Sequence, residues 1–391
     1  MYDELLTELG SAQFLVETFH LDHRYYPGLL SAPREAFDWN ALNHILGQHR
    51  LESPRLRLLR GGATLPGDSY FQRVRMRDGR VVSYVNDHAL SKEMERGATL
   101  VIEAIDEACE EVGWLANKLQ QLLRSQVGAS IYASRGHGST GLGDHWDDVD
   151  ILVIQLDGEK VWELRGPSRI WPLYRDSQRN EVPPEEVLAR YELRCGDVLY
   201  VPRGWWHTVE STDSPSLHLA FGIASKTGTD LISWISDRLL ECPIMRQDLP
   251  RFLKGDERKA YVQTFRTLVN QELSDDVLDR FFDDDDARAD SQSAHSLPWT
   301  IADTELTQRP RMVRVSAARM TYTVGKDAVV VIGNGHKFIL DLASEPVVAL
   351  LLKKRTCSFA ELCSGHGSGL GADEVLKLLI DFAKCGLVAL S

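Results

Sequence analysis

Apolar and polar residues follow two different periods in the first two thirds of the chain. Between residues 101 and 124, apolar positions recur every three or four residues with charged residues between them, so this stretch predicts one amphipathic helix that ends near Arg124. Short apolar runs broken by Gly, Asp and Pro come next, at residues 129–134, 149–156, 160–164, 198–201, 208–210 and 217–223. Many short strands with such punctuation predict a barrel or sandwich of antiparallel sheet.

The helical period returns at residues 229–282, and it predicts a helical segment that either serves in dimerisation or packs within the chain. This segment runs into Asp283 to Asp286, part of a stretch of eight aspartates between Asp275 and Asp290. Because such a run cannot bury itself, we expect it to be solvated and to mark a domain boundary.

The last hundred residues predict a small α+β domain. Strand-like runs at 329–332 and 337–340 precede helical stretches at 346–352, 358–363 and 372–385. The second of these helices has a capping box from Ser358 to Glu361, and the third ends at Gly386. The chain is therefore expected to divide into a strand-rich part with N-terminal helices (1–225), a helical, dimer-forming segment (226–290) and a winged-helix-like domain (291–391).

The charge balance argues against nucleic acid as the main ligand. The chain has 391 residues, 43% of them hydrophobic, with 44 basic and 57 acidic side chains and a net charge of −13. Residues 296–391 hold 11 basic and 9 acidic side chains, so the first 295 residues hold the other 33 and 48. An acidic surface repels phosphate, and an excess of two positive charges in the last part is too weak to indicate DNA binding.

The cysteines indicate a reducing compartment. They form neither a C-x-x-C pair nor a cluster with histidine, and the sequence shows no signal-peptide pattern and no apolar run of eighteen residues. We therefore expect a soluble cytoplasmic protein that does not bind membranes. The six cysteines are Cys109, Cys195, Cys242, Cys357, Cys363 and Cys385.

Two short motifs about sixty residues apart suggest a metal site. In an extended chain alternate side chains share a face, so His145 and Asp147 can converge on one ion while Asp144 and Asp148 face away and are poorer ligands. His207, just before the strand-like run at 208–210, would supply a second imidazole from another strand. Two histidines and one carboxylate are the facial triad of non-haem Fe(II) oxygenases, which leaves positions open for a cosubstrate and O₂.

A lysine lies on an apolar face close to this motif. Asp157-Gly158 predicts a two-residue hairpin turn, which would set Gln155 opposite Lys160 and place Lys160 on the same face as Val153. A lysine there either extends outward to water or an acid, or it holds the carboxylate of a small cosubstrate. A straight strand would hold the metal motif and the lysine too far apart for one small ligand. The second interpretation therefore requires either a curved strand or a folded-back loop before the strand that carries His145 and Asp147.

These segments together resemble the JmjC family, and within it the ribosomal-oxygenase subgroup. The resemblance rests on the motif His145-x-Asp147, on Lys160 fifteen residues after His145, and on the runs at 151–162 and 196–207. It is dense over about residues 125–225, and the order of barrel, helical dimerisation segment and winged-helix-like end also matches the subgroup in layout.

The resemblance implies a mainly β, cupin-like double-stranded β-helix with Fe(II) on His145, Asp147 and His207. It also implies that Lys160 binds the distal carboxylate of 2-oxoglutarate and that the chain forms a homodimer. Where eukaryotic members have N-x-Y-x-T before the metal motif, this chain reads Ser130-Ile131-Tyr132-Ala133-Ser134, so Ser130 replaces an asparagine near the cosubstrate. Tyr132 and Ser134 remain candidates to line the cosubstrate site.

Several aromatic residues allow two interpretations. Trp162, Trp205 and Trp206 either form a wall that faces the substrate or belong to the core, and the core is the commoner place for aromatic residues in a barrel. His218 is either a support behind the metal ligands or a core histidine, with the latter favoured. Histidines in Gly-rich loops are expected to face water; they are His137, His336 and His366.

The sequence is thus interpreted as an Fe(II)- and 2-oxoglutarate-dependent dioxygenase that hydroxylates a side chain of a protein or peptide, with a ribosomal-protein-like substrate favoured. Demethylation stays open, and so does a tailoring oxygenase that acts on a precursor peptide or small molecule. A non-enzymatic alternative is a cupin-like binding module whose C-terminal domain acts as a regulator. The joint presence of His145, Asp147, Lys160 and His207 argues against that alternative, because a scaffold has no need of all four.

Overall fold

The computed structural model describes residues 2–35, 37–136, 141–176, 181–289, 295–301, 309–364 and 369–391. The chain divides into two compact units, Met1–Ser225 and Lys226–Ser391. Their boundary coincides with the end of the predicted strand-rich part, whereas the division expected near residue 290 lies within the second unit and stays a prediction. His137 and His366 lie outside the described residues, and His336 is exposed as expected.

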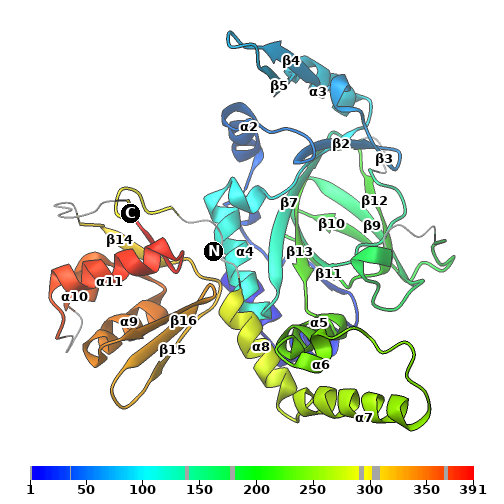
Figure 1. Ribbon diagram of the computed structural model, residues 1–391. Coiled ribbons are helices and arrows are strands. Elements are labelled where there is room, and N and C mark those ends of the chain that lie inside the picture. Colours follow the sequence, from blue (N-terminus) through cyan, green and yellow to red (C-terminus); the bar gives the residue numbers. More distant parts are fainter. Residues whose placement is uncertain are drawn as a thin grey trace. The chain divides into compact units, whose positions relative to one another are not determined.

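The first unit is built on two facing antiparallel sheets (Figure 1). The smaller sheet has the order β10-β9-β12, and the larger has the order β1-β11-β8-β13-β7-β6-β2-β3. The larger sheet consists of β1 (Arg24–Tyr26), β2 (Leu56–Arg60), β3 (Ala63–Thr64), β6 (Thr99–Ile102), β7 (Gln126–Ser134), β8 (Asp150–Asp157), β11 (Val198–Val201) and β13 (Ser216–Ala224). The smaller consists of β9 (Glu159–Pro167), β10 (Ala189–Arg194) and β12 (Trp205–Ser211).

The chain passes repeatedly between these two sheets, which is the arrangement of a double-stranded β-helix and confirms the predicted cupin-like fold, whereas the winged-helix-like form of the last part stays a prediction. Four helices, α1 (Asp3–Leu9), α2 (Trp39–Gln48), α3 (Asp87–Glu95) and α4 (Glu110–Leu123), belong to the same unit. Three of these helices contribute to the main apolar core, through Leu5, Leu42 and Leu119. The large sheet contributes residues such as Ile131 of β7 to the same core. A smaller core, with Val153, Trp162 and Leu164, lies between the two sheets.

The predicted hairpin at Asp157-Gly158 is wrong. Strand β8 pairs with β11 and β13, whereas β9 pairs with β10 and β12, so the turn carries the chain from one sheet to the other. Gly158 has a φ of +63°, and a Cβ there would lie 1.9 Å from the carbonyl oxygen of Pro215, so only glycine fits this corner. The predicted face of Lys160 is nevertheless correct, because alternation along a strand does not depend on its partner.

The helix predicted from residue 101 begins later than expected. Residues Thr99–Ile102 form the buried strand β6, and α4 begins only at Glu110. An apolar run of this length fits a fully buried strand as well as a helix, so its periodicity did not decide between them. The predicted end is confirmed, because Arg124 adopts a left-handed conformation (φ +51°) after the last turn.

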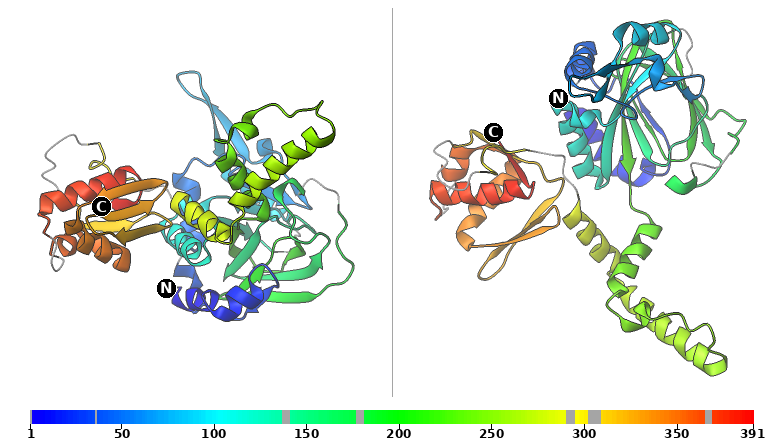
Figure 2. Two further views of the ribbon diagram at one scale, coloured as in Figure 1. Left: turned by 60° about the horizontal axis from the view of Figure 1, so that its bottom comes forward. Right: turned by 45° about the horizontal axis from the view of Figure 1, so that its top comes forward.

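The second unit begins with the predicted helices and ends in a small α+β arrangement (Figure 2). The helices are α5 (Gly228–Leu239), α6 (Pro243–Arg246), α7 (Gly255–Glu272), α8 (Val277–Arg288), α9 (Glu345–Lys354), α10 (Phe359–Ser364) and α11 (Ala372–Lys384). The strands form two sheets, β14 (Met312–Val315) with β18 (Thr356–Ser358) and β19 (Val388–Leu390), and β15 (Met320–Val324) with β16 (Val329–Gly333) and β17 (His336–Leu340). The capping box of Ser358 and Glu361 is confirmed by hydrogen bonds in both directions.

The aspartate run is solvated only in part, and the domain boundary expected there stays a prediction. Asp283 to Asp286 lie inside α8. Asp286 is buried and forms an ion pair with Arg319, and Asp284 accepts a hydrogen bond of 2.6 Å from Trp234 Nε1. Basic and indole partners thus offset the desolvation that a run of acids would otherwise suffer. No helix within the described ranges is long and apolar enough to cross a bilayer.

Candidate functional site

The metal motif lies on an extended segment that pairs with β12. His145 and His207 stand directly opposite each other and exchange two backbone hydrogen bonds, of 3.1 and 2.8 Å. Gly204 N donates to the carbonyl oxygen of Asp147 at 2.8 Å and fixes the segment two residues further on. The pairing brings residues from two distant parts of the sequence side by side, and it places the motif before β8, which is one of the two arrangements that the cosubstrate interpretation of Lys160 allowed.

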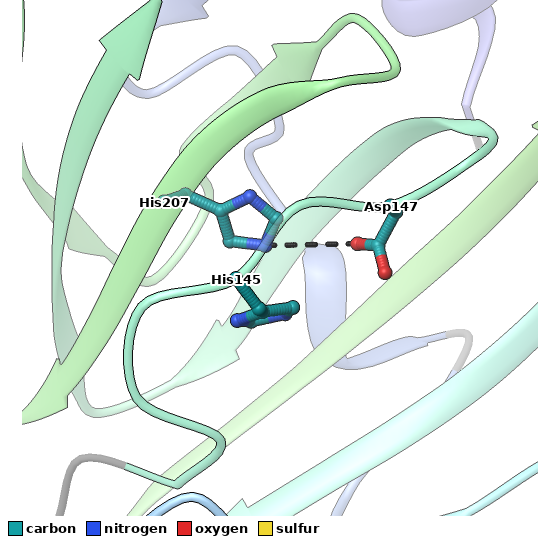
Figure 3. Close-up of side chains that lie close together, drawn as sticks. All are labelled: His145, Asp147 and His207. Carbon is teal, nitrogen blue, oxygen red and sulfur yellow. Dashed lines mark ion pairs between the residues drawn. The ribbon is translucent and has the colours of Figure 1, made fainter. Parts of the chain in front are cut away.

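His145, Asp147 and His207 point toward one another (Figure 3). Their ligating atoms all lie within 4.8 Å of one another, and His207 Nε2 is 3.6 Å from Asp147 Oδ2. His145 Nδ1 is bonded to the carbonyl of Gly143 at 2.9 Å, and His207 Nδ1 to that of Trp205 at 3.1 Å. Each imidazole therefore has Nε2 free for a metal, because a carbonyl partner keeps the proton on Nδ1.

Burial keeps His207 in its ligating form. Its side chain is almost fully enclosed, and this burial, followed by the neighbouring His145, lowers the pKa of His207. A neutral imidazole is the form that binds a metal. Two imidazole nitrogens and one carboxylate on one side of an ion fit Fe(II) of the non-haem type.

Asp144 lies outside the cluster, as the alternation predicted. It accepts hydrogen bonds from the hydroxyl of Thr208 and from Arg165 Nη1, the latter at 2.8 Å. Among the residues that the structure describes, the cluster of possible metal ligands consists of His145, Asp147 and His207 without Asp144 or Asp148.

A buried carboxylate that the sequence analysis missed supports the metal motif. Asp150, at the start of β8, is 1% exposed and accepts hydrogen bonds from the Tyr200 hydroxyl at 2.6 Å and from Arg203 N at 2.9 Å. His20 Nδ1 lies 2.6 Å from the same carboxylate. The network ties the start of β8 to the turn before β12, so both segments that carry metal ligands are held in place. The sequence did contain a signal for this role, because Asp150 is a charged residue at the start of an otherwise mostly apolar strand.

Lys160 points into the cavity beside the triad. The residue is 2% exposed, and its Nζ donates to Ser211 Oγ at 2.5 Å. Burial lowers the pKa of Lys160 from 10.5 to about 8. The cavity has apolar walls, and the polar side chains that line it are those of Thr99, Tyr132, His145, Asp147, Lys160, Trp162, His207 and His218.

The three predicted residues of β7 differ in their relation to this cavity. Tyr132 lines it and stacks on His218 with ring centroids 4.9 Å apart. Ser134 does not line it, but its hydroxyl lies 3.0 Å from Ser211 Oγ and so supports the partner of Lys160. Ser130 is not among the lining residues, although alternation places it on the same face of β7.

Trp162 and His218 present buried polar atoms without a partner. Trp162 stacks on His207 with centroids 5.4 Å apart, and within the described part of the chain its Nε1 and the Nδ1 of His218 have no hydrogen-bond partner. Burial, and then the charge of Lys160, lowers the pKa of His218 to about 3, so His218 is neutral. Unpaired buried polar atoms are costly, and a bound polar ligand would satisfy them.

The other two tryptophans are divided between the faces of β12. Trp206 is buried and donates to Ser168 Oγ at 2.9 Å, which is the core position that was favoured. Trp205 is half-buried and packs against the core between the sheets.

Residues 109–231 match the JmjC domain family. A bifunctional lysine-specific demethylase and histidyl-hydroxylase NO66 from Dictyostelium discoideum is 35% identical over 147 residues, which are 35% of this chain and 28% of that protein. Ribosomal oxygenase 2 from Rattus norvegicus is 33% identical over 131 residues, 32% of this chain and 27% of that protein. The chain thus matches less than a third of the length of these relatives.

The fold is also similar to a solved structure over almost its whole length. The ribosomal oxygenase YcfD from Escherichia coli, in a structure with cobalt and 2-oxoglutarate, has a TM-score of 0.59 and covers 97% of both chains at 17% identity. At that identity the similarity concerns the fold, and it extends over both units of this chain.

Proposed function

We propose that this chain, whose residues 109–231 form a JmjC domain, is an Fe(II)- and 2-oxoglutarate-dependent dioxygenase that hydroxylates a side chain of a protein, with ribosomal proteins as the favoured substrates. The observation that supports this most directly is the cavity in which a two-histidine, one-carboxylate cluster adjoins a buried lysine. The names of the relatives, which include histidyl-hydroxylase, demethylase and ribosomal oxygenase, support the choice of a protein substrate.

The cavity fits a dicarboxylate as well as a metal. Among the described residues the buried ammonium of Lys160 has the hydroxyl of Ser211, and no carboxylate, as its partner, so an anionic ligand would offset its desolvation. Trp162 Nε1, which has no hydrogen-bond partner in the described part of the chain, is a second donor in the same cavity. 2-Oxoglutarate offers a carboxylate for Lys160 at one end and metal-binding oxygens at the other.

Each of these residues has a distinct task in the proposed reaction. His145, Asp147 and His207 would hold Fe(II) and leave its other positions open for 2-oxoglutarate and O₂. When bound, Fe(II) supplies the activation of O₂ that couples decarboxylation of 2-oxoglutarate to oxidation of a substrate C–H bond. Lys160 orients the cosubstrate by its distal carboxylate, and the apolar walls, which include Ile151 and Val209, exclude water.

Mass spectrometry of candidate substrates tests the proposed activity. Purified ribosomal proteins incubated with the protein, Fe(II), 2-oxoglutarate and O₂ are expected to gain one oxygen atom on a single side chain. The His145→Ala variant serves as the control and should leave the proteins unmodified. Release of formaldehyde with loss of a methyl group would instead show demethylation, and turnover of precursor peptides or small molecules alone would favour a tailoring oxygenase. Absence of any 2-oxoglutarate turnover would favour the binding module.

We also propose that the helical segment 226–290 forms a homodimer in the cytoplasm. Helix α7 buries none of its residues within the chain, and Leu249, Phe252 and Val262 in and before it are 77%, 87% and 48% exposed. Apolar residues at this exposure in and before one helix are typical of an interface. Light scattering is expected to give twice the chain mass of 44.0 kDa for the wild type and a lower mass for Phe252→Asp/Val262→Asp. A wild-type mass of 44.0 kDa at every concentration would contradict the dimer.

A further inference from the structure

The hairpin of β4 (Phe71–Arg75) and β5 (Val81–Val85) is basic, although the chain is acidic. Residues 71–85 contain four arginines, no lysine and one aspartate, a net charge of +3, whereas the whole chain carries −13. The average charge of the first 295 residues hides this contrast, and the expectation that nucleic acid is not a direct ligand rests on that average.

The hairpin forms its own two-stranded sheet and projects from the barrel, at the top of Figure 1. Phe71 and Val85, at its base, pack against the main core, whereas every residue from Gln72 to Val81 is exposed. A two-stranded hairpin alone is only marginally stable in water. The fold therefore gains little stability from the outer half of the hairpin.

Its arginines are available for new contacts. The ladder sets Arg73 opposite Ser83 and Arg75 opposite Val81, so both arginines lie on one face. Arg73 pairs with Asp68 at 3.0 Å, with both side chains more than two thirds exposed. Neither Arg75 nor Arg77 forms an ion pair with any residue that the structure describes. Exposed pairs contribute little stability, so Arg73 can exchange its partner for another anion.

We infer that the β4–β5 hairpin binds RNA through the phosphate backbone. Arginine presents a planar fork that matches phosphate, and Tyr84, which is 40% exposed, offers a ring on which a base can stack. A membrane-binding segment would bury Trp, Phe or Leu in the lipid, and the exposed residues 72–81 contain none of these. The choice of RNA over DNA rests on the proposed function, because ribosomal proteins are substrates that carry RNA with them. RNA repels the acidic remainder of the chain, so RNA would meet the hairpin first.

Fluorescence anisotropy with a labelled single-stranded RNA of about 30 nucleotides tests this inference on the full chain without Fe(II) or 2-oxoglutarate. Arg75→Ala/Arg77→Ala is expected to weaken binding by about tenfold near 0.1 M salt. Because each lost phosphate contact on a single strand removes about 0.7 from the slope of log K against log salt, the slope should fall by about 1.4. Arg75→Lys/Arg77→Lys keeps both charges and should retain most of the slope.

A matched control removes the same charge elsewhere on the first unit. Arg50 and Arg190 are 52% and 60% exposed, and Arg50→Ala/Arg190→Ala should leave RNA binding unchanged. Equal weakening in the control, no RNA binding by the wild type at low salt, or tighter hairpin-dependent binding to duplex DNA or to phosphatidylserine vesicles would overturn the inference. The assay contains neither metal nor cosubstrate, so a negative RNA-binding result does not count against the proposed oxygenase activity. In the same way, a protein without oxygenase activity could still be tested for RNA binding.

Discussion

Asp147→Ala is expected to abolish tight metal binding while the barrel stays folded. Asp147 is the one carboxylate of the cluster, and its side chain is 39% exposed, so its removal leaves no large cavity. Loss of a residue that merely supports a metal ligand costs about 10- to 100-fold in affinity, so loss of a ligand should cost at least about 100-fold. Calorimetric titration with Mn²⁺, which replaces Fe(II) without turnover, measures the change.

Asp144→Ala is the matched control for this experiment. Asp144 lies three residues earlier and carries the same charge, but it contacts Thr208 and Arg165 and points away from the cluster. We expect its replacement to change metal affinity only slightly. Wild-type metal stoichiometry in both Asp147→Ala and His145→Ala would show that the cluster does not hold the metal.

The sequence predicted that His145 and Asp147 converge because their relative geometry depends on strand alternation alone. The motif His145-x-Asp147 needs only an extended backbone. His207 then joins these two residues because its strand pairs with the segment that carries them. The prediction of a hairpin at Gly158 was wrong because the geometry there depends on a contact that is distant in sequence. A turn of Asp and Gly specifies a sharp change of direction, but the contact with Pro215 that selects the other sheet lies 57 residues further along the chain.

The remaining differences also come from partners that lie far away in sequence. Asp286 can be buried because it forms an ion pair with Arg319, and the sequence of the aspartate run does not indicate this partner. The buried Asp150 acquires its role from Tyr200 and Arg203 on the approach to β12. Local composition thus predicts whether a segment is polar, whereas its burial depends on which opposite charges the fold brings to it.

Lys160→Met is expected to weaken 2-oxoglutarate binding and to stabilise the protein at the same time. Methionine keeps the apolar stem of the side chain but offers no charge to a carboxylate. Loss of a charge-assisted hydrogen bond costs about 1.5–3 kcal/mol, so the affinity for 2-oxoglutarate should fall by roughly 10- to 100-fold in the Mn²⁺-loaded protein. Metal affinity should not change, because Lys160 is not a ligand. Lys92→Met, at an exposed position of α3, is the control.

The gain in stability follows from the lowered pKa of Lys160, from 10.5 to about 8. The folded state disfavours the ammonium, so the cost of burying it is fully present below pH 8 and is relieved as the pH rises from about 8 toward 10.5. At neutral pH the variant should therefore be more stable than the unliganded wild type by up to about 3 kcal/mol. Thermal unfolding of the two proteins should show this difference shrinking above pH 8.

The same titration gives the pH dependence of cosubstrate binding. Only the charged form of Lys160 attracts a carboxylate, so the affinity of the wild type for 2-oxoglutarate should be constant below about pH 8 and decrease above it. The other titratable groups that line this part of the cavity do not interfere, because burial lowers the pKa of His218 to about 3 and raises that of Tyr132 above its usual range. Lys160→Met should show a weak affinity without this decrease. A wild-type affinity that equals that of Lys160→Met, or that stays constant through pH 9, would mean that the cosubstrate carboxylate is held elsewhere.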